Sequence, residues 1–154
     1  LDNEQLNRTR QEADRYAWYW QQTKLRHSDW TEIVEIVYDK AQVYRLRPEF
    51  IMSIIHVESS FNLVAQSWND SSMWPLAQGL MQVNTMVWKD ELEIDVDRIM
   101  NPAYNIDLGC KILRIYMDET NNDETKAAIL YNCGYKLSNP RYVPLMKSSP
   151  FYGR

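Results

Sequence analysis

Apolar residues recur at helical spacing through most of the chain, and no segment alternates polar and apolar residues over the length of an ordinary strand. The run from Asp29 places six such residues on one face: Trp30, Ile33, Val34, Val37, Ala41 and Tyr44. Asp29, followed three residues later by Glu32, resembles a capping box and predicts where this helix begins. The pattern therefore predicts an all-α fold.

Three further helices have clear start signals. A proline fits the first turn of a helix, where its missing N–H costs nothing, so we expect one helix from Pro48 to about Ser59 and another from Pro102. Asp123 predicts the start of a third helix, and Gly134 is its natural terminator. The helix from Pro102 carries a continuous stripe: Ile106, Gly109, Cys110, Leu113, Tyr116 and Met117.

The first part of the chain predicts a polar helix over about residues 3–22, with a dense aromatic second half: Tyr16, Ala17, Trp18, Tyr19 and Trp20. So many rings cannot all face water, so part of this helix must pack against the rest of the protein or a partner. We expect residues 1–28 to form a helical extension that packs on a domain made of residues 29–154.

Composition narrows the class of protein. The length of 154 residues suits one domain, and the net charge of −4 without a basic stripe argues against nucleic-acid binding. The longest nearly apolar stretch, residues 50–57, is too short to cross a bilayer. The chain starts with Leu1 rather than Met, which leaves room upstream for a signal, a membrane anchor or a tag.

Neither the two cysteines nor the two histidines form a metal pattern, so we expect no metal and no cofactor. A run of acids lacks the glycine and distal glutamate of a calcium loop, and we expect it to be a solvated surface: Asp90, Glu91, Glu93, Asp95 and Asp97.

Glu58 breaks the apolar pattern of its helix. It shares one face with Ile51, Ile54 and Ile55, so its carboxyl should point toward the core or the floor of a cleft. Loss of water there raises the pKa of a carboxyl, and a carboxyl that is protonated near neutral pH can act as a general acid. The alternative is that Glu58, in the last turn, swings out into solvent.

Four sequence blocks follow in order: E-S-S-F-N at 58–62, G-L-M-Q at 79–82, N-P through N-I to G at 101–109, and A-I-L-Y-N-C-G at 128–134. This set resembles the soluble lytic transglycosylase family, within the lysozyme-like superfamily that includes goose-type lysozymes. The resemblance covers about residues 38–143. It implies a lysozyme-like helical domain, to which the aromatic N-terminal helix is an addition.

The resemblance implies roles for individual residues. Glu58 matches the single catalytic acid of the family, and Tyr131 matches a tyrosine whose hydroxyl approaches the reacting sugar. The expected substrate-binding residues lie in or near the matching blocks: Ser60, Met81, Gln82, Asn132 and Tyr142. Asn132 is expected more to brace the local backbone, and Asn62 to order the turn after the catalytic helix.

The resemblance further implies cleavage of the β-1,4 bond between N-acetylmuramic acid and N-acetylglucosamine in peptidoglycan, with 1,6-anhydro ends as products. Such a carbon–oxygen lyase would work as a monomer on glycan strands in the periplasm or cell envelope, and a phage origin stays open. Two other functions are a hydrolytic muramidase of goose-lysozyme type and a non-catalytic wall-binding module. A helical protein-interaction domain would explain the aromatic helix but none of the blocks.

The chain departs from the family pattern in three places. Its link between the first two blocks is longer and holds Trp68 and Trp74, which could stack on sugars or fold onto the core. A glutamate common near the end of relatives is replaced by Ser138 or Asn139. Cys110 and Cys133 stand where relatives have small residues, either as buried thiols or as a disulfide. His56 is expected to be structural or part of the cleft wall.

Overall fold

The computed structural model describes residues 2–68, 77–133 and 141–153, except for the side chain of Cys133. Trp74, Gly134, Ser138 and Asn139, to which the sequence directs attention, lie outside the described residues. The described chain is mostly helical, as predicted: α1 (Asn3–Arg15), α2 (Ala17–Trp20), α3 (His27–Tyr44), α4 (Pro48–Ser59), α5 (Thr85–Trp88), a short 3-10 helix η1 (Val96–Arg98), α6 (Pro102–Glu119), α7 (Glu124–Cys133) and α8 (Tyr142–Ser148).

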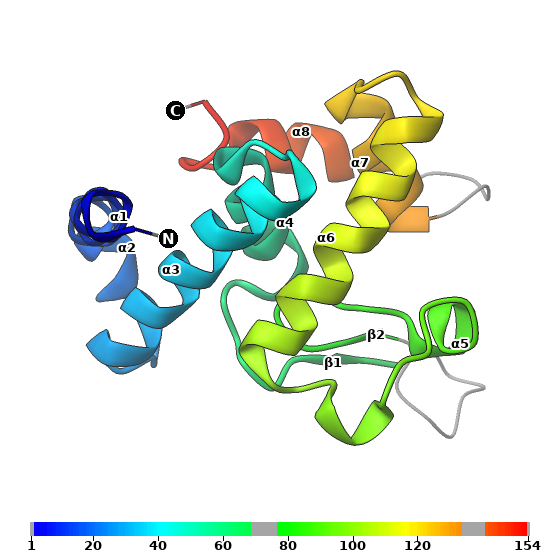
Figure 1. Ribbon diagram of the computed structural model, residues 1–154, viewed down its shortest axis with the longest axis horizontal. Coiled ribbons are helices and arrows are strands. Elements are labelled where there is room, and N and C mark those ends of the chain that lie inside the picture. Colours follow the sequence, from blue (N-terminus) through cyan, green and yellow to red (C-terminus); the bar gives the residue numbers. More distant parts are fainter. Residues whose placement is uncertain (1, 69–76, 134–140, 154) are drawn as a thin grey trace.

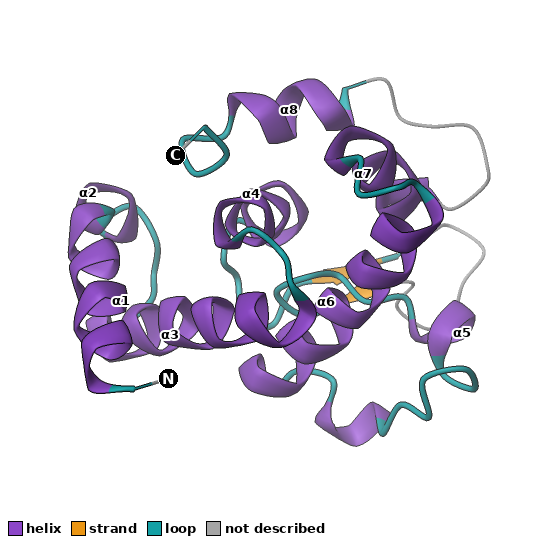
Figure 2. Cartoon of the chain, turned by 45° about the horizontal axis from the view of Figure 1, so that its top comes forward, coloured by secondary structure: helices purple, strands orange, loops and turns teal. Residues whose placement is uncertain are grey.

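The long helices form the frame of the molecule. α3 packs against α1, α4 and α6, and α8 packs against α4 and α7. α1 packs along α3 and is followed by α2, whereas a small hairpin and α5 lie beside α6 on the other side of the molecule (Figures 1 and 2). The hairpin joins β1 (Gln66–Ser67) to β2 (Ala77–Gln78) as antiparallel strands.

The apolar stripes predicted from the sequence meet in the core. Trp30, Ile33, Val34 and Val37 of α3 are fully buried, and so are Ile51, Ile54 and Ile55 of α4. The stripe of α6 is buried along its whole length. No helix in the described part of the chain is long and apolar enough to cross a membrane.

Helix starts follow the predicted chemistry in three cases. α4 and α6 begin at their prolines, and the side chain of Asn101 accepts a hydrogen bond from the N–H of Tyr104. The side chain of Asp123 accepts from the N–H of Lys126 at the start of α7, at 3.1 Å. These polar caps satisfy N–H groups that have no partner within the helix.

Two predictions about helices were wrong. The single helix over residues 3–22 is broken at Tyr16, which ends α1 and precedes α2. The break lets Tyr16 be buried while Trp18 stays half exposed. The capping box at Asp29 also fails, because α3 begins at His27 and Asp29 lies in its first turn, paired with Arg26 at 3.1 Å. An acid is favoured in a first turn by the helix dipole, which accounts for the misleading signal.

Candidate active site

Glu58 lies in the last turn of α4, directly beyond the buried isoleucine face. Its side chain is partly buried, and this burial raises the pKa of its carboxyl to about 8. The helix ends here because Ser60 and Phe61 adopt left-handed backbone conformations, with φ of 51° and 62°. The chain therefore leaves the helix axis directly after Ser59. The partial burial of Glu58 agrees with its predicted place on the isoleucine face.

A tyrosine from α8 touches the acid. The hydroxyl of Tyr142 donates a hydrogen bond to Oε2 of Glu58 at 3.1 Å, which opposes the rise in the pKa of Glu58. Tyr142 is itself buried, and burial together with the charge of Glu58 raises the pKa of its hydroxyl well above the usual value. Tyr142 is therefore a neutral donor near neutral pH.

Burial raises the pKa of the Tyr131 hydroxyl on α7, and the charge of Glu58 adds to this rise. In the structure, however, that hydroxyl donates to the carbonyl of Met81 at 2.6 Å. Tyr131 thus ties α7 to the segment 79–82. Asn132 beside it is partly buried.

The segment 79–82 is held from below by Asn105, a fully buried amide on α6. Its Oδ1 accepts from the N–H of Met81 at 2.8 Å, and its Nδ2 donates to the carbonyls of Gln78 and Ile99, each at 2.9 Å. Gly79 has φ of 79° and lies so close to this amide that no Cβ would fit. The Met81 side chain fills the space left by Gly109, where an added Cβ would lie 2.8 Å from Met81 Cβ.

Gln82 is buried, and its side chain is committed to the fold. Its Nε2 donates to the carbonyls of Gly79 and Ala65 at 3.0 and 3.1 Å, and its Oε1 accepts from the hydroxyl of Ser67 at 2.5 Å. The side chains of Gln82 and Met81, both expected to contact sugar, are buried in this structure. Gln82 braces the hairpin, and Met81 packs against α6 at Gly109.

Two serines follow Glu58, and the structure separates their places. Ser60, the predicted sugar contact, is exposed, and its hydroxyl lies 3.4 Å from the carbonyl of His56. Ser59 instead donates to the carbonyls of Leu80 and Ile55, at 2.7 and 3.1 Å. Ser59 and Asn105 are the site residues that sequence reasoning missed. A polar group on an apolar helix face was the available signal for Asn105.

Comparisons with known proteins address the family. The family model described as "Transglycosylase SLT domain" matches residues 35–139, which is more than half of the chain. The chain belongs to the transglycosylase SLT domain family. The SLT match includes Glu58, the segment 79–82 and Tyr131 but ends before Tyr142.

The fold agrees with that family. The structure of an inactive mutant of the lytic transglycosylase Slt from Pseudomonas aeruginosa superposes with a TM-score of 0.55 and 23% sequence identity, which confirms the helical, lysozyme-like fold. The match covers 72% of this chain but only 17% of that one. The comparison with curated proteins gives no match.

Other candidate groups in this SLT chain have clear places. Nδ1 of His56 lies 2.8 Å from Oγ of Ser149, so this side chain joins α4 to the residue after α8. Cys110 is a buried free thiol. Trp68 is 55% exposed next to β1. The five acids of residues 90–97 are exposed, and no cluster of metal-binding side chains occurs among the described residues.

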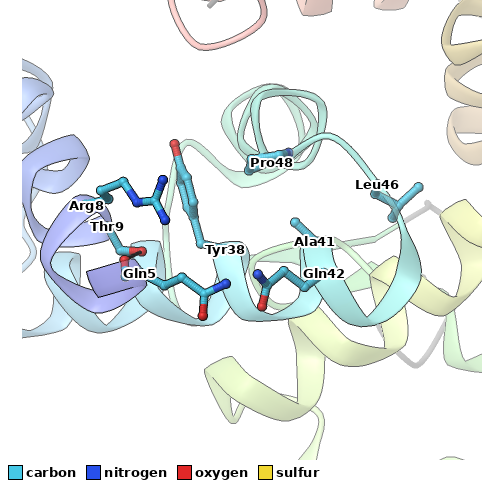
Figure 3. A pocket seen from close by; sticks show the side chains of 8 residues that line it. All are labelled: Gln5, Arg8, Thr9, Tyr38, Ala41, Gln42, Leu46 and Pro48. Atoms are coloured by element: carbon cyan, nitrogen blue, oxygen red, sulfur yellow. Dashed lines mark hydrogen bonds between the residues drawn. The ribbon is translucent and has the colours of Figure 1, made fainter. Parts of the chain in front are cut away.

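A pocket of about 370 Å³ lies between α1, α3 and the start of α4 (Figure 3). Its polar lining comes from Gln5, Arg8, Tyr38 and Gln42, and Pro48 belongs to its apolar wall. Pro48 and Glu58 occupy opposite ends of α4. This pocket is therefore separate from Glu58.

Proposed function

We propose that this chain is a peptidoglycan lytic transglycosylase that uses Glu58 as its only acid and base. One observation carries the proposal: within an SLT domain, the carboxyl at the end of α4 is buried enough to raise its pKa to about 8. Such a carboxyl still holds its proton at neutral pH, which is what protonation of a leaving oxygen requires. The substrate would be the β-1,4 bond between N-acetylmuramic acid and N-acetylglucosamine.

The contact with Tyr142 assigns different tasks to the two oxygens of Glu58. Oε2 accepts the hydrogen bond from Tyr142, so the transferable proton belongs on Oε1. When this proton passes to the glycosidic oxygen, the C1–O bond breaks and the carboxylate that forms is stabilised by the same tyrosine. The carboxylate then removes the proton from the C6 hydroxyl of the muramic residue, whose oxygen bonds to C1. Glu58 is protonated again and no water is consumed.

We propose bracing roles for the residues whose side chains point inward. Tyr131 fixes the carbonyl of Met81, and Gln82 fixes the hairpin, so both act on the shape of the cleft floor rather than on sugar. Ser60 and Asn132 remain the candidates for direct contact with the glycan. Trp68, exposed beside the hairpin, is a candidate for stacking on a sugar face.

A hydrolytic muramidase is the second candidate function. Inverting hydrolases hold water with a second carboxylate about 6.5–9.5 Å from the acid. The side-chain contact that the structure gives Glu58 is with Tyr142, which is not a carboxylate. The family match supports the transglycosylase as the first candidate. In either case the substrate lies outside the cytoplasm, so we propose a place in the periplasm or cell envelope, and action as a monomer.

Digestion of purified peptidoglycan followed by mass spectrometry tests the proposal. The transglycosylase yields 1,6-anhydro ends that are lighter than hydrolysed ends by one water and resist borohydride. A digest dominated by reducible ends would establish the muramidase. Binding to peptidoglycan without any new ends, at several pH values, would establish a non-catalytic wall-binding module. The Glu58→Gln variant serves as the control for contaminating activity.

A further inference from the structure

Six rings meet on the side of α4 that faces the two ends of the chain. This aromatic cluster consists of Tyr16, Tyr19, Trp30, His56, Phe61 and Phe151. Phe151 is at its centre, with ring centroids 4.6 Å from Tyr16, 5.2 Å from Tyr19 and 5.4 Å from Phe61. The rings of His56 and Trp30 lie 5.6 and 6.3 Å from it.

The cluster joins parts of the chain that the family match does not include. Tyr16, Tyr19 and Trp30 precede residues 35–139, and Phe151 follows them. Only His56 and Phe61 belong to the matched region, and they flank Glu58 in sequence. The extra helices at the start and the residues after α8 thus meet on His56 and Phe61, which lie two residues before and three residues after Glu58.

The residues after α8 are also anchored by polar contacts. The hydroxyl of Ser149 meets His56, as described above. Farther on, Arg47 donates to the carbonyl of Tyr152 at 3.1 Å, and its guanidinium lies 4.9 Å from the centre of the Tyr152 ring. Arg47 is itself held by Glu124 through two hydrogen bonds of 3.0 and 3.1 Å. Residues 149–152 are therefore fixed from both sides.

This anchored segment directly follows α8, the helix that carries Tyr142. We propose that the aromatic cluster is a positioning device for the acid, in which Phe151, packed on Tyr16 and Tyr19, holds α8 so that Tyr142 stays in contact with Glu58. The N-terminal extension thereby acts on the active site without touching substrate. The effect on turnover rests on the proposed function, whereas the effect on the Glu58–Tyr142 contact does not.

A cluster that served only for stability would leave the acid unchanged when it is weakened. A buried aromatic pair contributes about 0.5–1.5 kcal/mol beyond its buried area, so many cluster variants will lower stability in any case. The decisive measurement is therefore made on Glu58 itself. The hydrogen bond from Tyr142 lowers the pKa of Glu58, so any variant that loosens this bond should raise it.

The experiment is a carbon-13 NMR titration of the glutamate carboxyls, with the Glu58 signal assigned by its absence in Glu58→Gln. We expect Tyr142→Phe and Phe151→Leu each to raise the pKa of Glu58 by about 0.5 or more. The double variant should match Tyr142→Phe alone, because both substitutions remove the same contact. Val37→Ala, a core change in α3 outside the cluster, should lower stability and leave the pKa of Glu58 unchanged.

An unchanged pKa in folded Phe151→Leu, or effects that simply add in the double variant, would overturn the proposal. If Phe151→Leu does not fold, Tyr19→Leu at the edge of the cluster takes its place with the same criteria. A second readout is turnover: kcat should fall at least about fivefold in Phe151→Leu with little change in KM. Full activity of Glu58→Gln would refute the proposed function alone, since the titration does not depend on it.

Discussion

Glu58 keeps its proton because the chain buries it, and this burial has a cost that depends on pH. Its pKa is raised from 4.5 to about 8 in the folded protein, with the hydrogen bond from Tyr142 acting in the opposite direction. Between these two pH values the folded protein retains a proton that the unfolded chain releases. The free energy of unfolding of the wild type therefore falls as the pH rises from 4.5 to 8.

Glu58→Gln should remove this dependence. At pH 4 the variant and the wild type should be about equally stable, whereas at pH 8 and above the variant should be more stable by on the order of 2–4 kcal/mol. Urea unfolding at pH 4, 6 and 8 measures the difference. A gain that is equal at all three values would mean that Glu58 is not titrating as described.

The same substitution should lower turnover of peptidoglycan by about 10²–10⁴-fold, because glutamine can neither give nor recover the proton. In the wild type, activity should decline above about pH 8 as Glu58 loses its proton. Release of soluble muropeptides across a pH series measures both effects. A variant within about threefold of wild type would remove Glu58 from the mechanism.

Tyr131→Phe tests a residue that braces the site. The carbonyl of Met81 would lose its partner in a partly buried place, which should cost about 1–3 kcal/mol and lower kcat more than it weakens glycan binding. Tyr44→Phe is the matched control, because its hydroxyl donates to Asp107 at 2.7 Å, between α3 and α6. That control should lose stability and keep its activity.

The partial burial of Glu58 could be predicted from sequence because its evidence is local: a carboxyl on an isoleucine face shows in the helical period of α4. The partners of Tyr131 and Gln82 could not be predicted in this way. Their hydrogen bonds join α7 to Met81 and Gln82 to Ala65, and such pairings depend on how distant segments meet. The family resemblance named these residues but said nothing of what their polar atoms bind.

Among the elements, long helices with a proline or a polar cap at their start were predicted well and short elements were not. The starts of α4, α6 and α7 have local signals in Pro48, Pro102 and Asp123. The break at Tyr16 has none, since residues 3–22 suit a continuous helix and only burial against α3 and Phe151 interrupts it. Strands of two residues, like those of the hairpin, have too few positions to show an alternation.

Asn105→Leu should be the most damaging change within α6. It would leave the N–H of Met81 and the carbonyls of Gln78 and Ile99 without partners, at a cost of about 3–5 kcal/mol. Asn101→Ala, which removes only the cap of the same helix, should cost about 1 kcal/mol. Chemical denaturation of the two variants measures the contrast. Equal losses would show that Asn105 does not support the segment 79–82.

At the scale of the whole molecule, we propose that the first 28 residues are an extension on which the domain depends. The indole N–H of Trp30 donates to the carbonyl of Ala13 at 3.0 Å, and α1 packs along α3. The density of aromatic residues indicated that part of the N-terminal helix packs against other residues. It could not indicate that Phe151 is one of them.

Removal of residues 1–26 should lower the melting temperature by about 10 °C, since it uncovers the face of α3 that carries Trp30 and removes two rings of the cluster. Thermal unfolding followed by circular dichroism measures the loss. Trp18→Ala, a change at a half-exposed ring of α2, should have little effect. A truncated chain as stable as the full one would mean that the extension is dispensable.

The packing of Phe151 on Tyr16 also bears on the order of folding events, because it brings together the beginning and the end of the sequence. Closing so long a loop is entropically costly, and contacts of this kind usually form after the folding transition state. Substitutions at Phe151 should then speed unfolding and leave the refolding rate nearly unchanged. On the ribosome, the contact between Tyr142 and Glu58 would be secured only after Phe151 has emerged, well after Glu58 itself.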